Sequence, residues 1–188
     1  MEPHEFLLLV MRAVGGEIQG KTKLQKTVYF LGILTDRVDT LGYRAHFYGP
    51  YSSEVAEAVM SLKAIGVLDQ NIVGGGTVDD AGFEVKRYDY RLNHQGQTLA
   101  AAKAEQYPHV WKQLEAASQT FRRAGEIDYM PLSVAAKTYF MLGQKRGRAT
   151  ETELAALAPR FGWHVTPEEI RDAAQYLQKL GLVEMAAH

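Results

Sequence analysis

The chain of 188 residues predicts a mainly α fold with a small β-hairpin (α+β): a winged helix-turn-helix followed by a second helical unit of helix-turn-helix type. Three observations predict this arrangement. Apolar residues at helical spacing fill three segments within the first 66 residues. Two strand-like runs flank a glycine-rich turn directly after them. The order of an apolar helix, a turn and a capped helix then returns near the end of the chain.

Two helices open the first unit. Apolar periodicity predicts them over residues 3–14 and 22–35, with Gly20 between them. The second helix is apolar nearly all round, so we expect it to be buried on several sides. A glycine inside a helix costs about 1 kcal/mol relative to alanine, so Gly32 predicts the close approach of a neighbouring backbone. Residues 36–43 are expected to form a loop.

The segment HFYGPYSSEVAEAVMSLKAIGVL, residues 46–68, is expected to organise this unit. Its Gly-Pro pair predicts a turn, and Ser52 or Ser53 supplies the N-cap of a third helix. That helix carries apolar residues at core spacing, namely Val55, Val59, Leu62 and Ile65. Its exposed first turns carry Glu54 and Glu57, which repel a polyanion, so we expect it to pack or to dock a protein rather than to read bases.

Three aromatic residues surround the Gly-Pro turn. We expect Phe47, Tyr48 and Tyr51 to fill the gap between the second and third helices, because aromatic side chains mostly serve cores. The alternative is a stacking platform for a base or a small ligand.

A hairpin and a broken helical pair follow. Strands are predicted over residues 67–73 and 83–92, and the glycine-rich tip between them would make this hairpin the wing. After a turn at 93–96, Pro108 divides the next stretch into helices over 97–106 and 108–123. The apolar stripe of the later helix can dock on its own core or on a second subunit. We expect a homodimer, formed by this stripe or by the C-terminal unit.

The sequence predicts three parts: a winged-helix lobe with trailing helices over 1–124, a linker over 125–131 and a helical unit over 132–188. Helices of the last part are expected over 132–142, 150–158 and 166–180. Two of them open with capping boxes, which pair Thr150 with Glu153 and Thr166 with Glu169.

Composition restricts the function. The net charge is −1, whereas a dedicated DNA-binding domain is usually strongly basic. Because there is no cysteine, a disulfide framework and a thiolate zinc site are excluded. The six histidines are scattered and no catalytic motif is found, so we expect a non-enzymatic protein without cofactor or metal. The first residues lack the basic start of a signal peptide, and no stretch approaches about 18 apolar residues, so we expect a cytoplasmic protein with no membrane partner.

Nine basic residues in three groups are the candidates for contact with nucleic acid. They are Lys21, Lys23 and Lys26 at the start of the second helix, Lys86, Arg87 and Arg91 on the returning strand, and Lys145, Arg146 and Arg148 before residue 150. Cations on a wing and at helix ends can contact phosphate without reading sequence. The alternative for each group is a solvated face, and for the first group also an acidic partner.

The runs GKTKLQKTVYFL and HFYGPYSSEVAEAVMSLKAIGVL resemble the YwgA-like uncharacterised bacterial and archaeal proteins. They are more loosely similar to the SocA-type (Panacea-domain) antitoxins. The resemblance covers roughly residues 21–99. It rests on Lys23, Leu24, Gln25, Lys26, Tyr48, Gly49, Pro50 and Ser52. It implies a winged-helix scaffold, and the antitoxin domain acts by binding protein partners as well as by regulation.

Two functions follow as hypotheses. The first is a winged-helix DNA-binding protein, a transcription regulator acting as a dimer, with the basic residues of the wing and of residues 145–148 on phosphate. The second is a protein-interaction module of antitoxin or defence-adaptor type on the same scaffold, which the near-neutral charge and the acidic third helix favour.

Overall fold

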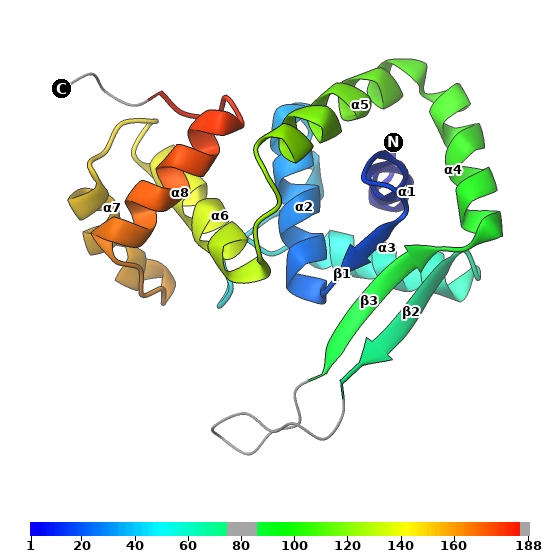
Figure 1. Ribbon diagram of the computed structural model, residues 1–188, viewed down its shortest axis with the longest axis horizontal. Helices are drawn as coiled ribbons and strands as arrows, with labels where there is room; N and C mark the ends of the chain where they lie inside the picture. Colours follow the sequence, from blue (N-terminus) through cyan, green and yellow to red (C-terminus); the bar gives the residue numbers. More distant parts are fainter. Residues whose placement is uncertain (75–85, 185–188) are drawn as a thin grey trace.

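Helices dominate the structure, and a small antiparallel sheet accompanies them (Figure 1). The computed structural model describes residues 1–74 and 86–184. The first part of the chain forms α1 (Pro3–Ala13), β1 (Glu17–Gln19), α2 (Lys21–Leu34), the 3-10 helix η1 (Val38–Leu41), α3 (Ser53–Ala64), β2 (Leu68–Val73), β3 (Arg87–Leu92), α4 (His94–Gln106) and α5 (Pro108–Arg123). The second forms α6 (Tyr129–Gln144), α7 (Glu151–Leu157), the 3-10 helix η2 (Ala158–Phe161) and α8 (Pro167–Lys179). The predicted mainly α protein with a small β component is confirmed.

The sheet has three strands in the order β1-β3-β2, all antiparallel. The sequence predicted only the β2–β3 hairpin, because a strand of three residues is too short to show an alternating pattern. In β1, Ile18 is buried opposite Tyr90 of β3, and its two neighbours are exposed. Residues 75–85, which include most of the predicted hairpin tip, lie outside the described part.

Helix α1 lies at the centre of the first part, whereas the sequence predicts that the 46–68 segment organises it. Figure 1 shows α1 nearly end-on, with α2, α3, α4 and α5 around it. Its residues from Leu7 to Met11 are all buried, as is typical of a helix that is apolar all round. Helix α3 covers one side of it with Val55 and Leu62. The predicted core residue Ile65 is instead 60% exposed, because it is the C-cap where the helix ends, and Val67 takes the next inward position.

Helix α2 is shared between two cores, which explains why it is apolar nearly all round. Leu24 and Val28 belong to the cluster built on α1, whereas Tyr29 and Phe30 pack with α6 and α8. The predicted burial on several sides is thus confirmed. The close approach predicted at Gly32 is also confirmed, because a Cβ there would lie 3.3 Å from the Val38 backbone.

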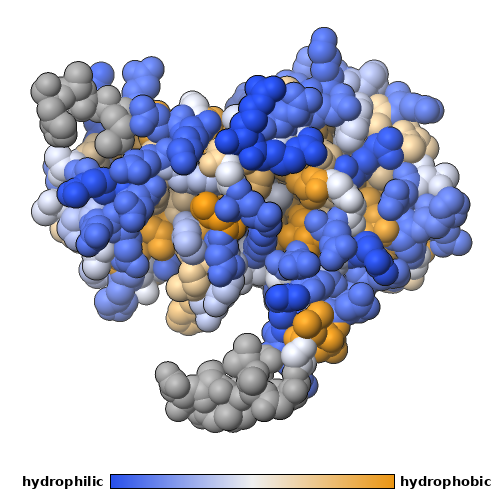
Figure 2. All heavy atoms as spheres, in the orientation of Figure 1, coloured by the Kyte–Doolittle hydropathy of each residue, from blue (hydrophilic) through white to orange (hydrophobic). Residues whose placement is uncertain are grey.

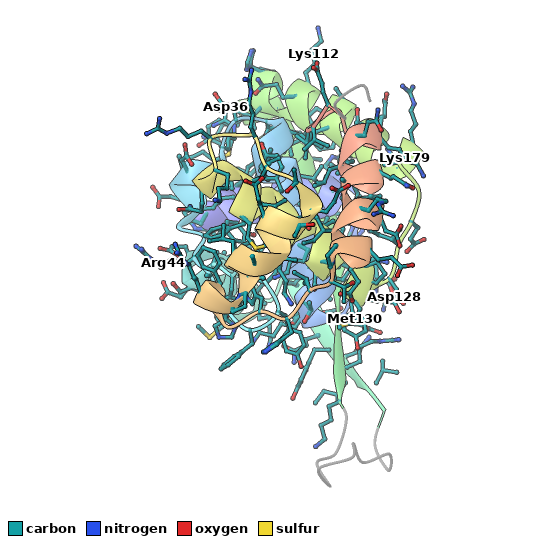
Figure 3. The ribbon with its side chains drawn as sticks, turned by 90° about the vertical axis from the view of Figure 1, so that its left-hand side faces the viewer. Asp36, Arg44, Lys112, Asp128, Met130 and Lys179 are labelled. Carbon is teal, nitrogen blue, oxygen red and sulfur yellow. The ribbon has the colours of Figure 1, made fainter. Side chains whose placement is uncertain are left out.

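The segment between α5 and α6 is shorter than the predicted linker. Helix α6 already begins at Tyr129, because Asp128 caps it and a proline is tolerated in a first turn. Figure 3 places Asp128 and Met130 on the side of the molecule from which the β2–β3 hairpin projects. The apolar stripe of α5, with Val110 and Leu114, is buried in the core of its own chain, so it is not available for the dimer contact considered above.

The second part has a small core of its own. Met141, Leu154, Trp163 and Ile170 are buried together between α6, α7 and α8. Both predicted capping boxes are confirmed, at the starts of α7 and α8.

Candidate functional site

The turn that joins η1 to α3 is clamped by a side chain of α2. The Gln25 amide donates to the carbonyl of Ser52 at 2.9 Å, and the backbone N–H of Ser52 donates to Gln25 Oε1 at 3.0 Å. The Tyr43 hydroxyl donates to the Gln25 carbonyl at 2.8 Å. Gln25 and Ser52 are both buried, so these bonds form away from water and hold the turn in one place.

Lys26 lies beneath the same turn and is only 1% exposed. Its ammonium donates to the Pro50 carbonyl at 2.6 Å. Burial, and after it the positive charge of Lys137 on α6, lowers the pKa of Lys26 to about 7. The expectation that Lys26 projects into solvent or meets an acidic group is therefore wrong. A buried ammonium on a backbone carbonyl is also not placed to contact nucleic acid.

The second part of the chain holds the other side of the turn. The Trp163 indole N–H donates to the His46 carbonyl at 2.6 Å. Gly49 adopts a φ of +95°, and a Cβ there would lie 3.3 Å from the Ser133 carbonyl of α6. A side chain at this position would be strained by the positive φ and would need its neighbours on α6 to move slightly, so the turn between α2 and α6 favours glycine.

Two aromatic side chains of the turn face solvent. Phe47 is 80% exposed and Tyr48 is 55% exposed. The expectation that they fill the gap between α2 and α3 is wrong, because Gln25, Lys26 and the backbone of the turn already occupy that gap. Only Tyr51 is half-buried, and its ring packs against His46 with centroids 5.0 Å apart.

The first turn of α2 lies beside the root of the β2–β3 hairpin. The N–H of Gly20 donates to the Tyr88 carbonyl of β3 at 3.1 Å. Lys21, the next residue, is exposed and its ammonium lies 6.0 Å from the centroid of the Tyr51 ring. Arg87 directly precedes Tyr88 and is also exposed. The structure thus brings Lys21 and Arg87 together at one edge, next to the aromatic turn.

Carboxylates accompany several of the predicted basic residues. Lys23 pairs with Glu126 at 2.6 Å. Arg87 pairs with Asp89 through two bonds of 2.8 and 2.9 Å, which raise the pKa of the guanidinium. These pairs reduce the positive potential that either cation presents to a distant polyanion.

Arg91 has an acidic residue on both neighbouring strands. In the sheet register it lies opposite Glu17 of β1 and opposite Asp69 of β2. Because directly opposed residues of antiparallel strands point to the same face, both carboxylates accompany the guanidinium. Arg91 is therefore a weaker candidate for phosphate than Arg87 or Lys21.

The third basic group lies apart from the first two. Lys145, Arg146 and Arg148 are exposed in the loop after α6. Helix α6 has 16 residues, so it is roughly 24 Å long. Leu132 and Ala136 in its first half pack with Tyr29 and Phe30 of α2. The loop consequently lies away from the hairpin (Figure 1), so the third basic group is separate from the first two.

Helix α3 begins with a negative charge. Ser52 is its N-cap, with the hydroxyl accepting from the N–H of Val55 at 2.9 Å, which resolves the choice between Ser52 and Ser53. The Glu54 carboxylate accepts hydrogen bonds from the backbone N–H of Glu54 and from the Ser53 hydroxyl, and these hold the pKa of Glu54 below its usual range. This carboxylate is therefore ionised at neutral pH. Further along, Met60 is exposed. The first turns of α3 are thus acidic, and its one exposed basic residue, Lys63, lies in the last turn.

The visible surface in Figure 2 is mostly hydrophilic. An apolar patch lies where the hairpin leaves the body, and the exposed end of β2 there consists of Ile72 and Val73. A cavity of about 730 Å³ lies beneath β1, between α2, α5 and the segment that leads to α6. It is within the range of ligand sites in proteins.

The sequence indicates Gln25, Lys26 and the Gly-Pro turn but not how they connect. Nor does it indicate Trp163 and Tyr43, which belong to no motif and form their hydrogen bonds across 117 and 18 residues respectively. Within residues 1–74 and 86–184, no group of three or more His, Asp or Glu side chains is arranged to hold a metal ion. Nor is any helix in these ranges long and apolar enough to cross a membrane.

No protein-family model matches the chain, and a comparison with curated proteins finds no match. The resemblance drawn from the two sequence runs therefore stays a prediction.

Proposed function

We propose that the protein is a non-enzymatic winged-helix regulator that binds duplex DNA through the edge formed by Lys21, Lys86 and Arg87. We name it the hairpin-side edge.

Two features support the winged-helix scaffold. The element order α1-β1-α2-α3-β2-β3 is that of a winged helix, and so is the strand order β1-β3-β2. The turn between α2 and α3 is unusually long for a helix-turn-helix, because η1 and the clamped turn occupy it.

One observation carries the proposal: the bond from the Gly20 N–H to the Tyr88 carbonyl. It fixes the positive end of a 14-residue helix against the hairpin strand, so that Lys21 and Arg87 share an edge. Anions are favoured at helix N-termini, and the cations add to that preference. The exposed Arg87–Asp89 pair does not prevent this use, because surface ion pairs contribute only about 0–1 kcal/mol and a phosphate can replace the carboxylate.

The contacts expected from this edge are few and independent of sequence. Of the six candidate cations in the first part of the chain, Lys26 is buried, Lys23 faces the cavity beneath β1 and Arg91 lies opposite two carboxylates. The proposal therefore places phosphate on the other three. Three phosphate contacts predict that log K falls with log salt with a slope of roughly −2.7.

Binding to a duplex of mixed sequence, measured by fluorescence anisotropy over a salt series, tests the proposal. We expect binding at low salt with a slope near the value above. An absence of binding at low salt, or an affinity that salt does not change, contradicts it.

A second function is favoured by the exposed aromatic pair. Phe47 and Tyr48 project from a turn that is held by Gln25, Lys26 and Trp163, so little entropy is lost when a partner covers them. Exposed aromatics of this kind are frequent anchors of protein interfaces. We propose, as the alternative, a protein partner with an apolar pocket and a carboxylate rim, because the exposed cations Lys21 and Arg44 flank the turn.

Co-purification of the tagged protein from its host tests this alternative. We expect a partner in stoichiometric amount that the double variant Phe47→Ser/Tyr48→Ser no longer retains. A variant in the loop after α6, Arg146→Ala/Arg148→Ala, is the control and should retain it. A partner that both variants retain equally contradicts docking at the turn.

The homodimer stays a prediction. The apolar stripe of α5 is buried in the core of its own chain. We therefore propose that the C-terminal unit forms the dimer contact.

A further inference from the structure

The cavity beneath β1 has walls from both parts of the chain. Lys23 and Thr27 of α2 line it together with Phe121 and Arg122 of α5. Tyr176 of α8 and the segment from Gly125 to Ile127 close it toward the second part. At about 730 Å³, the space is large enough for a molecule of metabolite size.

Two residues with hydroxyl groups, Thr27 and Tyr176, also line this cavity. No hydrogen bond of either hydroxyl is found within residues 1–74 and 86–184, and neither oxygen is among the buried polar atoms that lack a partner. Both oxygens are therefore open to solvent, and a ligand in the cavity can bond to each of them. Burial raises the pKa of the Tyr176 phenol, which keeps this group neutral and able to donate.

The charged residues that line the cavity are Glu17 of β1, Lys23 of α2, Arg122 of α5 and Glu126 of the segment that leads to α6. Arg122 makes one long hydrogen bond of 3.4 Å, from Nη2 to the Ser118 hydroxyl, and no ion pair of it is found in the described part of the chain. Lys23 is held by Glu126, whose side chain is 84% exposed. An exposed carboxylate is weakly bound and can be displaced by an anion that enters from solvent. The apolar part of the lining includes Phe121 and Leu132.

From these groups we infer that the cavity is a binding site for a small organic anion with an apolar body, a carboxylate or a phosphate ester. Its anionic group binds Arg122 and Lys23 and displaces Glu126. Its apolar body covers Phe121 and Leu132, and its polar atoms form hydrogen bonds with the hydroxyls of Thr27 and Tyr176. The site does not depend on whether the protein binds DNA or another protein.

Isothermal titration calorimetry with the complete chain tests the site. The probes are 2-naphthoate, decanoate and 1-naphthyl phosphate, with neutral 2-naphthamide as the control for charge. We expect at least one anion to bind saturably at millimolar or lower concentration. Loss of a charge-assisted hydrogen bond predicts about tenfold or weaker affinity for Arg122→Ala. Arg123→Ala is the matched control, since the neighbouring arginine does not line the cavity, and it should bind like the unchanged protein.

A second variant separates loss of binding from loss of folding. Tyr176→Phe removes only the hydroxyl, and we expect severalfold weaker binding with an unchanged circular dichroism spectrum. The site is refuted if none of the three anions binds. It is equally refuted if Arg122→Ala binds as well as Arg123→Ala, or if 2-naphthamide binds as tightly as 2-naphthoate. Because no DNA is present, failure here leaves the proposed regulator function untouched.

Discussion

The side chain of Gln25 bonds both backbone groups of Ser52, with distances of 2.9 and 3.0 Å across 27 residues of sequence. The side-chain amide thus pairs with the backbone of the turn as a neighbouring strand would. It thereby orients Ser52, the N-cap of α3. The neighbouring residue Lys26 holds the Pro50 carbonyl in the same way. The K-L-Q-K run and the G-P-Y-S run are therefore two halves of one structural device.

Replacement of Gln25 by alanine tests this device. The change leaves the Ser52 N–H and carbonyl buried without partners, and each unsatisfied group costs about 1–3 kcal/mol. We expect the free energy of unfolding to fall by about 2–4 kcal/mol, measured by urea denaturation. Gln119→Ala, at an exposed position of α5, is the control and should change it by less than about 0.5 kcal/mol. Equal stability of the two variants would show that the clamp is dispensable.

Lys26 should make stability depend on pH in the alkaline range. Its pKa is about 7 in the folded chain, whereas the ordinary pKa of a lysine is 10.5. Between these two pH values the proton is therefore bound mainly in the unfolded chain. Stability rises with pH wherever the unfolded state binds more protons. From pH 7 to about pH 9.5 we expect the free energy of unfolding to increase by about 2–3 kcal/mol, measured by urea denaturation at each pH.

The variant Lys26→Met supplies the comparison. It has no proton to lose at this position, so the increase above pH 7 should disappear. Lys137 is the other cation at this place, and its pKa is lowered by burial, so it adds to the slope in both proteins. A slope that is the same in the two proteins would mean that Lys26 is not the cause.

Local patterns predicted the helices because their causes are local. Capping boxes at Thr150 and Thr166, and the break at Pro108, each act within a few residues, and all three are found in the structure. The site could not be predicted in the same way. The bond from Trp163 to His46 spans 117 residues, and nothing near Lys26 signals that its ammonium is buried.

Exposure of Phe47 shows the same limit from the other direction. The aromatic ring of Phe47 favours burial in a core. The gap between α2 and α3 is instead filled by Gln25 and Lys26, two polar residues of α2, and Phe47 stays exposed. Composition cannot decide which of two segments occupies one space, because that depends on tertiary packing.

Gly96 tests how α4 is joined to the sheet. A Cβ at this position would lie 2.1 Å from the Val67 carbonyl oxygen, which belongs to the backbone and cannot move aside without shifting β2. We expect Gly96→Ala to lower the free energy of unfolding by about 3 kcal/mol. Gly143→Ala in α6 is the matched control, because a Cβ there meets nothing within 4 Å and should stabilise the helix by up to about 1 kcal/mol. Thermal unfolding of both variants gives the comparison, and a stable Gly96→Ala protein would contradict the packing described.

The position of the DNA contact is tested by two variants with equal loss of charge. One removes the hairpin-side edge as Lys21→Ala/Lys86→Ala/Arg87→Ala, and the other removes Lys145, Arg146 and Arg148. Both lower the net charge by three, so long-range attraction changes equally and only local phosphate contacts differ. We expect the first to reduce the salt slope by roughly 2.7 and to abolish binding at moderate salt, and the second to keep the slope. The measurement is duplex binding by fluorescence anisotropy over a salt series.

Two outcomes would contradict this position. If only the variant that lacks Lys145, Arg146 and Arg148 loses the salt slope, the DNA binds to the second part of the chain. If both keep it, then neither α2 nor the hairpin root is the contact, and the aromatic turn becomes the site to test with a protein partner.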